Sequence, residues 1–191
     1  MDIKANTSNN TVFADNKGNI AYWHGNFVPI RDPGKDWSLV QDGTKSANDW
    51  KGLHPVEQIV HVINPKTAWI QNCNSTPFTV SGSASPLRTS YPAYMAPDGE
   101  NFRGVNAVKV LDKEKSYTID KVIAAGYDTN LAAFEVLIPS LVNVFEKNVK
   151  PTDSLYAALS EPIAELKKWN YHSSETSVAT TLAIEWAGKL S

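Results

Sequence analysis

Hydrophobic and polar residues alternate over short runs in the first part of the chain and follow a helical period in the second. Residues 11–14 and 20–23 are β-favouring runs, and the stretch between them, Asp-Asn-Lys-Gly-Asn, consists of turn formers. This pattern predicts a β-hairpin within residues 11–31. Gly18 is expected to supply the positive φ that a tight turn needs.

Further along the first part, the pattern predicts one more strand and two long loops. The apolar run at 69–72 predicts a third strand, whereas residues 57–63 alternate irregularly. Residues 32–56 are rich in Pro, Gly, Asp and Lys, which indicates an ordered loop. The Ser-, Pro- and Gly-rich stretch 76–101 carries several aromatic side chains and is too long for a plain connector. We expect it to be functional or to pack against another part of the protein.

The hydrophobic pattern of the second half of the chain predicts helices. Apolar residues recur at the spacing of one helix face in 102–111, 118–127, 131–145, 153–169 and 174–190. Thr118 and Thr152-Asp153 are plausible helix starts, and Ser177 is an alternative start for a shorter last helix. The expected fold is therefore α+β, with a β-rich part (1–77), a long loop (78–102) and a helical part (103–191).

Composition narrows the functional class without naming it. The chain has 191 residues, of which 42% are hydrophobic and 20% charged, as in ordinary globular proteins. A net charge of -2 gives no electrostatic case for nucleic acid or for an anionic membrane surface. Apolar runs end well before the ~20 residues needed to span a bilayer. The single cysteine, Cys73, excludes an internal disulfide.

The most informative polar residue is Asn74, which follows an apolar run just before Pro77. A side-chain amide at such a turn can donate a hydrogen bond to the negative charge that develops on a reacting carbonyl. It can also simply cap the turn. No nucleophile motif accompanies it, and Cys73 is more typical of a small packing residue than of a catalytic thiol.

The remaining candidate groups favour structural interpretations. No standard zinc spacing relates the histidines, which are His24, His54, His61 and His172. Asp15 with Asn19 resembles the start of a calcium loop but lacks the regular oxygen ligands, so a turn is favoured. The tryptophans of the first half are expected to anchor the core and the loops, with a carbohydrate-binding face as the alternative.

Three segments of the chain carry a series of short motifs in a fixed order. Residues 10–31 contain Ala-Asp-Asn-Lys-Gly-Asn-Ile-Ala-Tyr and then Pro29 and Arg31. Residues 50–77 contain Trp-Lys-Gly, Asn-Pro and Asn-Cys-Asn-Ser-Thr-Pro, and Arg-Gly-Val-Asn-Ala-Val follows at 103–108. This series resembles the penicillin acylase family of N-terminal-nucleophile amidohydrolases, with its Ala-Asp-x-x-Gly-Asn-Ile-x-Tyr hairpin, the following Pro-x-Arg and the later motifs in the same order. The match at 103–108 is weaker than the other two.

The resemblance implies an αββα sandwich and a set of site residues. In this family an N-terminal residue of the β chain, usually serine and freed by autocatalytic cleavage, attacks the amide, and its own α-amine acts as base. The resemblance places the oxyanion asparagine at Asn74 and the arginine that orders the site at Arg103. Asn9 falls at an acyl-pocket position, and Phe78 and Tyr94 of the long loop are further substrate-binding candidates.

The same resemblance predicts that the chain is an interior excerpt of a β chain. Met1-Asp2 offers no competent N-terminal nucleophile, so the isolated chain is expected to be inactive. Its expected partners are the rest of the acylase and a small N-acyl amide, such as a β-lactam or an acyl-homoserine lactone; an isolated excerpt is also expected to self-associate. No cofactor is expected, and the calcium ligands of some relatives fall partly outside this stretch. Family habit suggests a periplasmic or secreted parent.

Two other functions remain open on the sequence. A non-catalytic domain that binds a sugar or a peptide through aromatic loops would use Trp37 or Tyr94 and would not need Asn74. An autonomous enzyme that uses Cys73 is the third possibility, which alkylation of the thiol tests.

Overall fold

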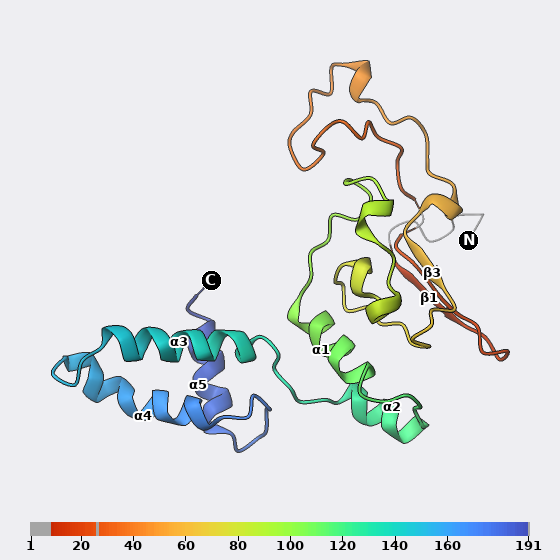
Figure 1. The fold of residues 1–191 in the computed structure, drawn as a ribbon. Coiled ribbons are helices and arrows are strands. Elements are labelled where there is room, and N and C mark those ends of the chain that lie inside the picture. Colours follow the sequence, from red (N-terminus) through yellow and green to blue (C-terminus); the bar gives the residue numbers. More distant parts are fainter. Residues whose placement is uncertain (1–8, 26, 191) are drawn as a thin grey trace. The chain divides into compact units, whose positions relative to one another are not determined.

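The computed structural model describes residues 9–25 and 27–190, which fall into two compact units, Met1–Lys115 and Ser116–Ser191 (Figure 1). The first unit holds a three-stranded sheet, and the second is helical in its described part. The predicted α+β class is therefore confirmed. The finer division at 77 and 102 rested on sequence character and stays a prediction.

The sheet of the first unit is antiparallel, in the order β1-β2-β3. Its strands are β1 (Thr11–Ala14), β2 (Ile20–Trp23) and β3 (His61–Ile63). The β1–β2 turn is the predicted one, with Gly18 at φ 86°. Asp15 Oδ1 accepts the N–H groups of Lys17 and Asn19, both at 2.9 Å, so its carboxylate builds the turn.

The third strand is not the predicted one. The expectation of a strand at 69–72 is wrong, because this stretch pairs with a neighbouring loop. Gln71 N–H donates to Val80 O at 2.8 Å, and Trp69 O accepts from Ser81 Oγ at 2.8 Å. An apolar run shows that a segment is buried, but it does not show what the backbone pairs with.

Asn64 ends β3 and ties it to the hairpin. Its backbone has φ 47°, a left-handed conformation that asparagine tolerates better than most residues. The Asn64 N–H donates to Ile20 O, and Asn64 Oδ1 accepts from Ile20 N, both at 2.9 Å. The asparagine of the Asn-Pro motif thus has a structural role, because it fastens the end of β3 to the start of β2.

The loops of the first unit are ordered around a small core. They contain short 3₁₀ turns: η1 (Ser46–Asn48), η2 (Val56–Gln58), η3 (Pro77–Thr79), η4 (Gly82–Ala84) and η5 (Arg88–Ser90). Val60, Met95 and Ala96 are buried together, and Phe78, Tyr91 and Tyr94 pack around them. Helix α1 (Phe102–Leu111) follows, with the predicted bounds.

The second unit contains helices α2 (Ile119–Gly126), α3 (Phe134–Asn148), α4 (Ser154–Lys168) and α5 (Val178–Ala187). Its core is formed by Phe134, Ile138, Leu166, Trp169, Ala179 and Ala183. The last helix is shorter than residues 174–190, because Ser177 caps it by accepting Thr180 N–H at 3.1 Å. None of the helices in the described ranges is long and apolar enough to cross a membrane.

Candidate functional site

Asn74 sits in a turn whose backbone conformation suits asparagine. Its φ of 53° lies in the left-handed region, which side chains other than Gly and Asn adopt at a cost of about 1–2 kcal/mol. The turn is held from outside, because Asn101 Nδ2 donates to both Cys73 O and Asn74 O at 3.1 Å. The position of Asn74 therefore depends on Asn101.

Asn101 is also the N-cap of α1. Its Oδ1 accepts the N–H of Gly104 at 2.9 Å, which satisfies one of the unpaired donors at the start of the helix. A single amide side chain therefore caps the helix with its oxygen and holds the Asn74 turn with its nitrogen. Only a neutral amide offers both an acceptor and two donors.

Gly104 lets the first turn of α1 approach this segment closely. A Cβ at Gly104 would lie 2.5 Å from Ser75 Oγ and 2.8 Å from Ser75 Cβ. Ser75 is only 5% exposed, so it has little room to move. The close approach brings the neighbouring Arg103 to Asn74, where Arg103 Nη2 donates to Asn74 Oδ1 at 3.3 Å.

The contact with Arg103 fixes which way the Asn74 amide points. Arginine has only donors, so the atom of Asn74 that faces it must be the oxygen. The other end of the amide, Nδ2, has no hydrogen-bond partner within residues 9–25 and 27–190. Asn74 is exposed and lines a pocket, so this N–H donor is available to a group that enters it.

The pocket beside Asn74 has a volume of about 450 Å³ and mainly polar walls. Its lining residues are Asn9, Asn10, His24, Gly25, Val28, Asn72, Asn74, Ser75, Met95 and Asp98. Asparagines connect part of this wall, because Asn72 Oδ1 accepts from both Asn10 Nδ2 and Asn74 N at 3.4 Å. The start of the hairpin is thereby linked to the Asn74 turn.

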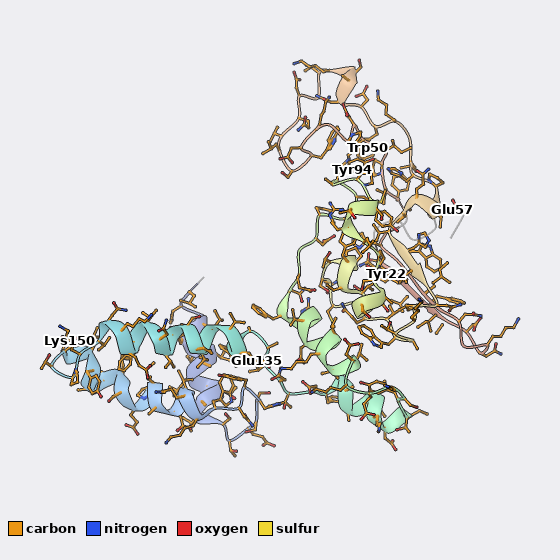
Figure 2. All side chains as sticks on the ribbon, in the orientation of Figure 1. Tyr22, Trp50, Glu57, Tyr94, Glu135 and Lys150 are labelled. Atoms are coloured by element: carbon orange, nitrogen blue, oxygen red, sulfur yellow. The ribbon has the colours of Figure 1, made fainter. Side chains whose placement is uncertain are left out.

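His24 forms the centre of a hydrogen-bonded row at the pocket wall. Its Nε2 lies 3.0 Å from Asp98 Oδ2, and its Nδ1 lies 3.0 Å from the hydroxyl of Tyr22, labelled in Figure 2. The carboxylate only accepts, so a neutral His24 donates from Nε2 to Asp98 and accepts at Nδ1 from Tyr22. The row joins β2 to the loop that leads into α1.

Burial dominates the proton affinities in this row. Removal from water lowers the pKa of His24 below its ordinary value of 6.5, although the charge and hydrogen bond of Asp98 act in the opposite direction. Burial also raises the pKa of Tyr22, and the negative charge of Asp98 adds to this rise. At neutral pH the row therefore holds an uncharged imidazole and an uncharged phenol.

Comparison with known proteins identifies the family. A family model described as penicillin amidase matches residues 1–191, the whole chain. The chain belongs to the penicillin amidase family. It is 43% identical over 68 residues to penicillin G acylase from Escherichia coli, a match that covers 36% of this chain and 8% of that protein.

A solved penicillin amidase supports the fold. A thermostable penicillin G acylase from Alcaligenes faecalis is similar in structure, with a TM-score of 0.56 at 19% sequence identity. The likeness covers 87% of this chain and 28% of that one. The resemblance inferred from the motifs is thus confirmed. The matches cover less than a third of the length of either relative.

The structure brings some of the predicted site residues of this penicillin amidase chain together and separates others. Asn74 contacts Arg103, and Asn9 lines the same pocket as Asn74. Phe78 instead packs against Tyr91, with ring centroids 6.2 Å apart. Tyr94, labelled in Figure 2, bonds through its hydroxyl to His54 Nε2 at 2.9 Å. Neither lines the Asn74 pocket, and their role in binding substrate remains a prediction.

Other residues of the site were missed by sequence reasoning. The sequence could have identified Asn101 as an N-cap, because asparagine directly before a helical run is favoured at that position. The pairing of His24 with Asp98 has no local signal, since the two residues are far apart in the chain. No group of three or more His, Cys, Asp or Glu side chains in the described ranges is arranged to hold a metal.

Replacing Gly104 with alanine should destabilise the first unit. The added Cβ overlaps the buried Ser75, which outweighs the better helix propensity of alanine. We expect the free energy of unfolding to fall by about 1–2 kcal/mol in total. Gly126→Ala is the matched control, because no atom of the described residues lies within 4 Å of its Cβ position at the end of α2. It should be neutral or stabilising in urea unfolding. Equal effects of the two variants would contradict the close approach.

The protonation of His24 should make the first unit less stable in acid. Its folded-state pKa lies below 6.5, so the unfolded chain binds the proton more readily. The contribution of neutral His24 to the free energy of unfolding is therefore complete above pH 6.5. It is lost as the pH falls through the pKa of His24 in the folded state. An NMR titration should place the His24 midpoint below 6.5, and lower still in Asp98→Asn. A midpoint that rises in this variant would contradict the assignment.

Proposed function

We propose that the protein containing this chain is an N-acyl amidohydrolase, and that Asn74 stabilises the oxyanion of its tetrahedral intermediate. The observation that carries this proposal is the orientation of the Asn74 amide, whose oxygen faces Arg103 at 3.3 Å. A preorganised N–H donor at a pocket is what oxyanion stabilisation requires. Membership of the penicillin amidase family supports the same reaction class.

In this proposal Arg103 is a positioning residue that orients Asn74. The chain covers only 28% of the solved acylase that it resembles, which leaves room for the nucleophile to come from another part of the polypeptide. We propose an N-terminal nucleophile exposed by autocatalytic processing, as the family resemblance implies. The 191-residue chain by itself should then be inactive.

The proposed substrate is a small N-acylated molecule, such as a β-lactam or an acyl-homoserine lactone. Hydrolysis of the first would serve antibiotic conversion, and hydrolysis of the second would serve quorum quenching. We further propose a periplasmic or secreted parent. The exposed apolar side chains of the edge strands, Val12, Phe13 and Ile63, would face the rest of the acylase or, in the isolated chain, a second copy.

Hydrolysis by full-length variants tests the role of Asn74. Asn74→Gly keeps the left-handed turn and removes the amide, so it separates chemistry from folding. We expect the rate to fall by about 10²–10³ on whichever N-acyl amide the wild type cleaves, in a panel of phenylacetyl, glutaryl and acyl-homoserine-lactone substrates. Asn74→Asp, which keeps the acceptor for Arg103 but has no N–H donor, should be similarly impaired.

Asn64→Gly is the matched control, because Asn64 is also a left-handed asparagine but does not line the pocket. It should keep near-normal activity after maturation. Equal rates for the wild type and Asn74→Gly would mean that Asn74 only shapes a turn. A matured wild type that cleaves no member of the panel, yet binds a sugar or a peptide through Trp37 or Tyr94, would favour the non-catalytic alternative.

A further inference from the structure

We propose that Arg31 forms a carboxylate-binding site, separate from the Asn74 pocket, between the loop after β2 and residues 93–97. We base it on the packing of Arg31, on its Nε, which has no hydrogen-bond partner among the described residues, and on the pocket that Arg31 lines. It does not depend on the proposed hydrolase reaction.

Two indole rings hold the guanidinium of Arg31. Its Cζ lies 5.3 Å from the ring centroid of Trp37 and 5.9 Å from that of Trp50. Such contacts attract the cation to the ring faces but do not satisfy its N–H groups. Trp37 is itself fixed, because its Nε1 donates to Asp32 O at 2.7 Å. The planar fork is therefore held in place before any ligand arrives.

One nitrogen of the guanidinium, Nε, is buried without a hydrogen-bond partner among the described residues. No described carboxylate forms an ion pair with this side chain. The backbone is well held, since Arg31 N–H donates to Tyr94 Oη at 3.3 Å. A buried unpaired donor on a cation is costly, so the geometry suits an anion that the described residues do not supply.

The pocket at Arg31 has a volume of about 680 Å³. It is lined by Arg31, Pro33, Gly34, Lys35, Asp36, Trp37, Ser38, Ala93, Tyr94 and Pro97. The other charges of this wall are already engaged. Lys35 lies 4.0 Å from Asp32 and hydrogen-bonds to Ala47 O at 3.1 Å, and Asp36 accepts from Ser38 N and Oγ. Among the described residues that line this pocket, Arg31 is therefore the cation that remains available to bind a ligand.

The walls indicate the class of ligand. A guanidinium fork pairs best with a planar two-oxygen anion, which a carboxylate supplies. The indole and the phenol of the wall suit a flat apolar body behind that carboxylate. The carboxylate has two sources: a free aromatic acid, or an Asp or Glu side chain from a part of the polypeptide outside these residues.

The Nε–H signal of Arg31 in a ¹⁵N-edited NMR spectrum of the 191-residue chain tests the site. Titration with benzoate should move this signal downfield in a saturable way, whereas benzamide, which has the same shape but no charge, should leave it in place. Arg88 is the internal control. It also stacks on an aromatic ring, at 5.0 Å from Phe78, but already donates to Pro92 O and Ala93 O. Its signal should not move.

Arg31→Lys keeps the charge and removes the fork, so benzoate affinity should fall about tenfold, the loss of one charge-assisted hydrogen bond. The same titration in the full-length protein distinguishes a free aromatic acid from an Asp or Glu side chain as the source of the carboxylate. If a side chain fills the site, the Arg31 signal is already downfield there and benzoate no longer moves it. If the site stays open, benzoate moves it as before. An Arg31 signal in the 191-residue chain that ignores benzoate, or follows benzamide equally, would overturn the proposal.

Discussion

The side chain of Asn101 is the constraint on which the rest of the site depends. Its oxygen caps α1 through Gly104 N–H, and its nitrogen holds the carbonyls of Cys73 and Asn74. Helix and turn are thereby fixed to each other by one group. The close packing of Gly104 on Ser75 sets the same spacing sterically. Because of this spacing Arg103 reaches the side-chain oxygen of Asn74. The amide N–H of Asn74 then faces away from Arg103.

The parts of this arrangement that the sequence could predict are the local ones. The hairpin turn and the bounds of α1 follow from turn chemistry and from helical period, both of which act over a few residues. The predicted strand at 69–72 failed because an apolar run does not reveal its hydrogen-bond partner. Asn74 was singled out by its place at a turn after an apolar run, and Arg103 by the family motifs. The pairing of His24 with Asp98 joins distant segments, so no local pattern predicts it.

Two of the pockets in the first unit differ in character, although both use the segment 93–98. Met95 and Asp98 line the polar pocket at Asn74, while Tyr94 and Pro97 line the aromatic pocket at Arg31. In the first, hydrogen bonds between neutral amides position a donor. In the second, ring stacking positions a cation. A chain that spans a fraction of its acylase relatives thus presents two prepared donors, each without its acceptor among the described residues.

A crystal structure of Asn101→Asp beside the wild type tests directly whether Asn101 positions the site. Aspartate keeps the oxygen that caps α1 but has no N–H for the carbonyls of Cys73 and Asn74. We predict an unchanged helix start, a displaced turn and loss of the contact between Arg103 and Asn74. An intact turn in which Arg103 Nη2 still donates to Asn74 Oδ1 would contradict the claim that Asn101 positions the site.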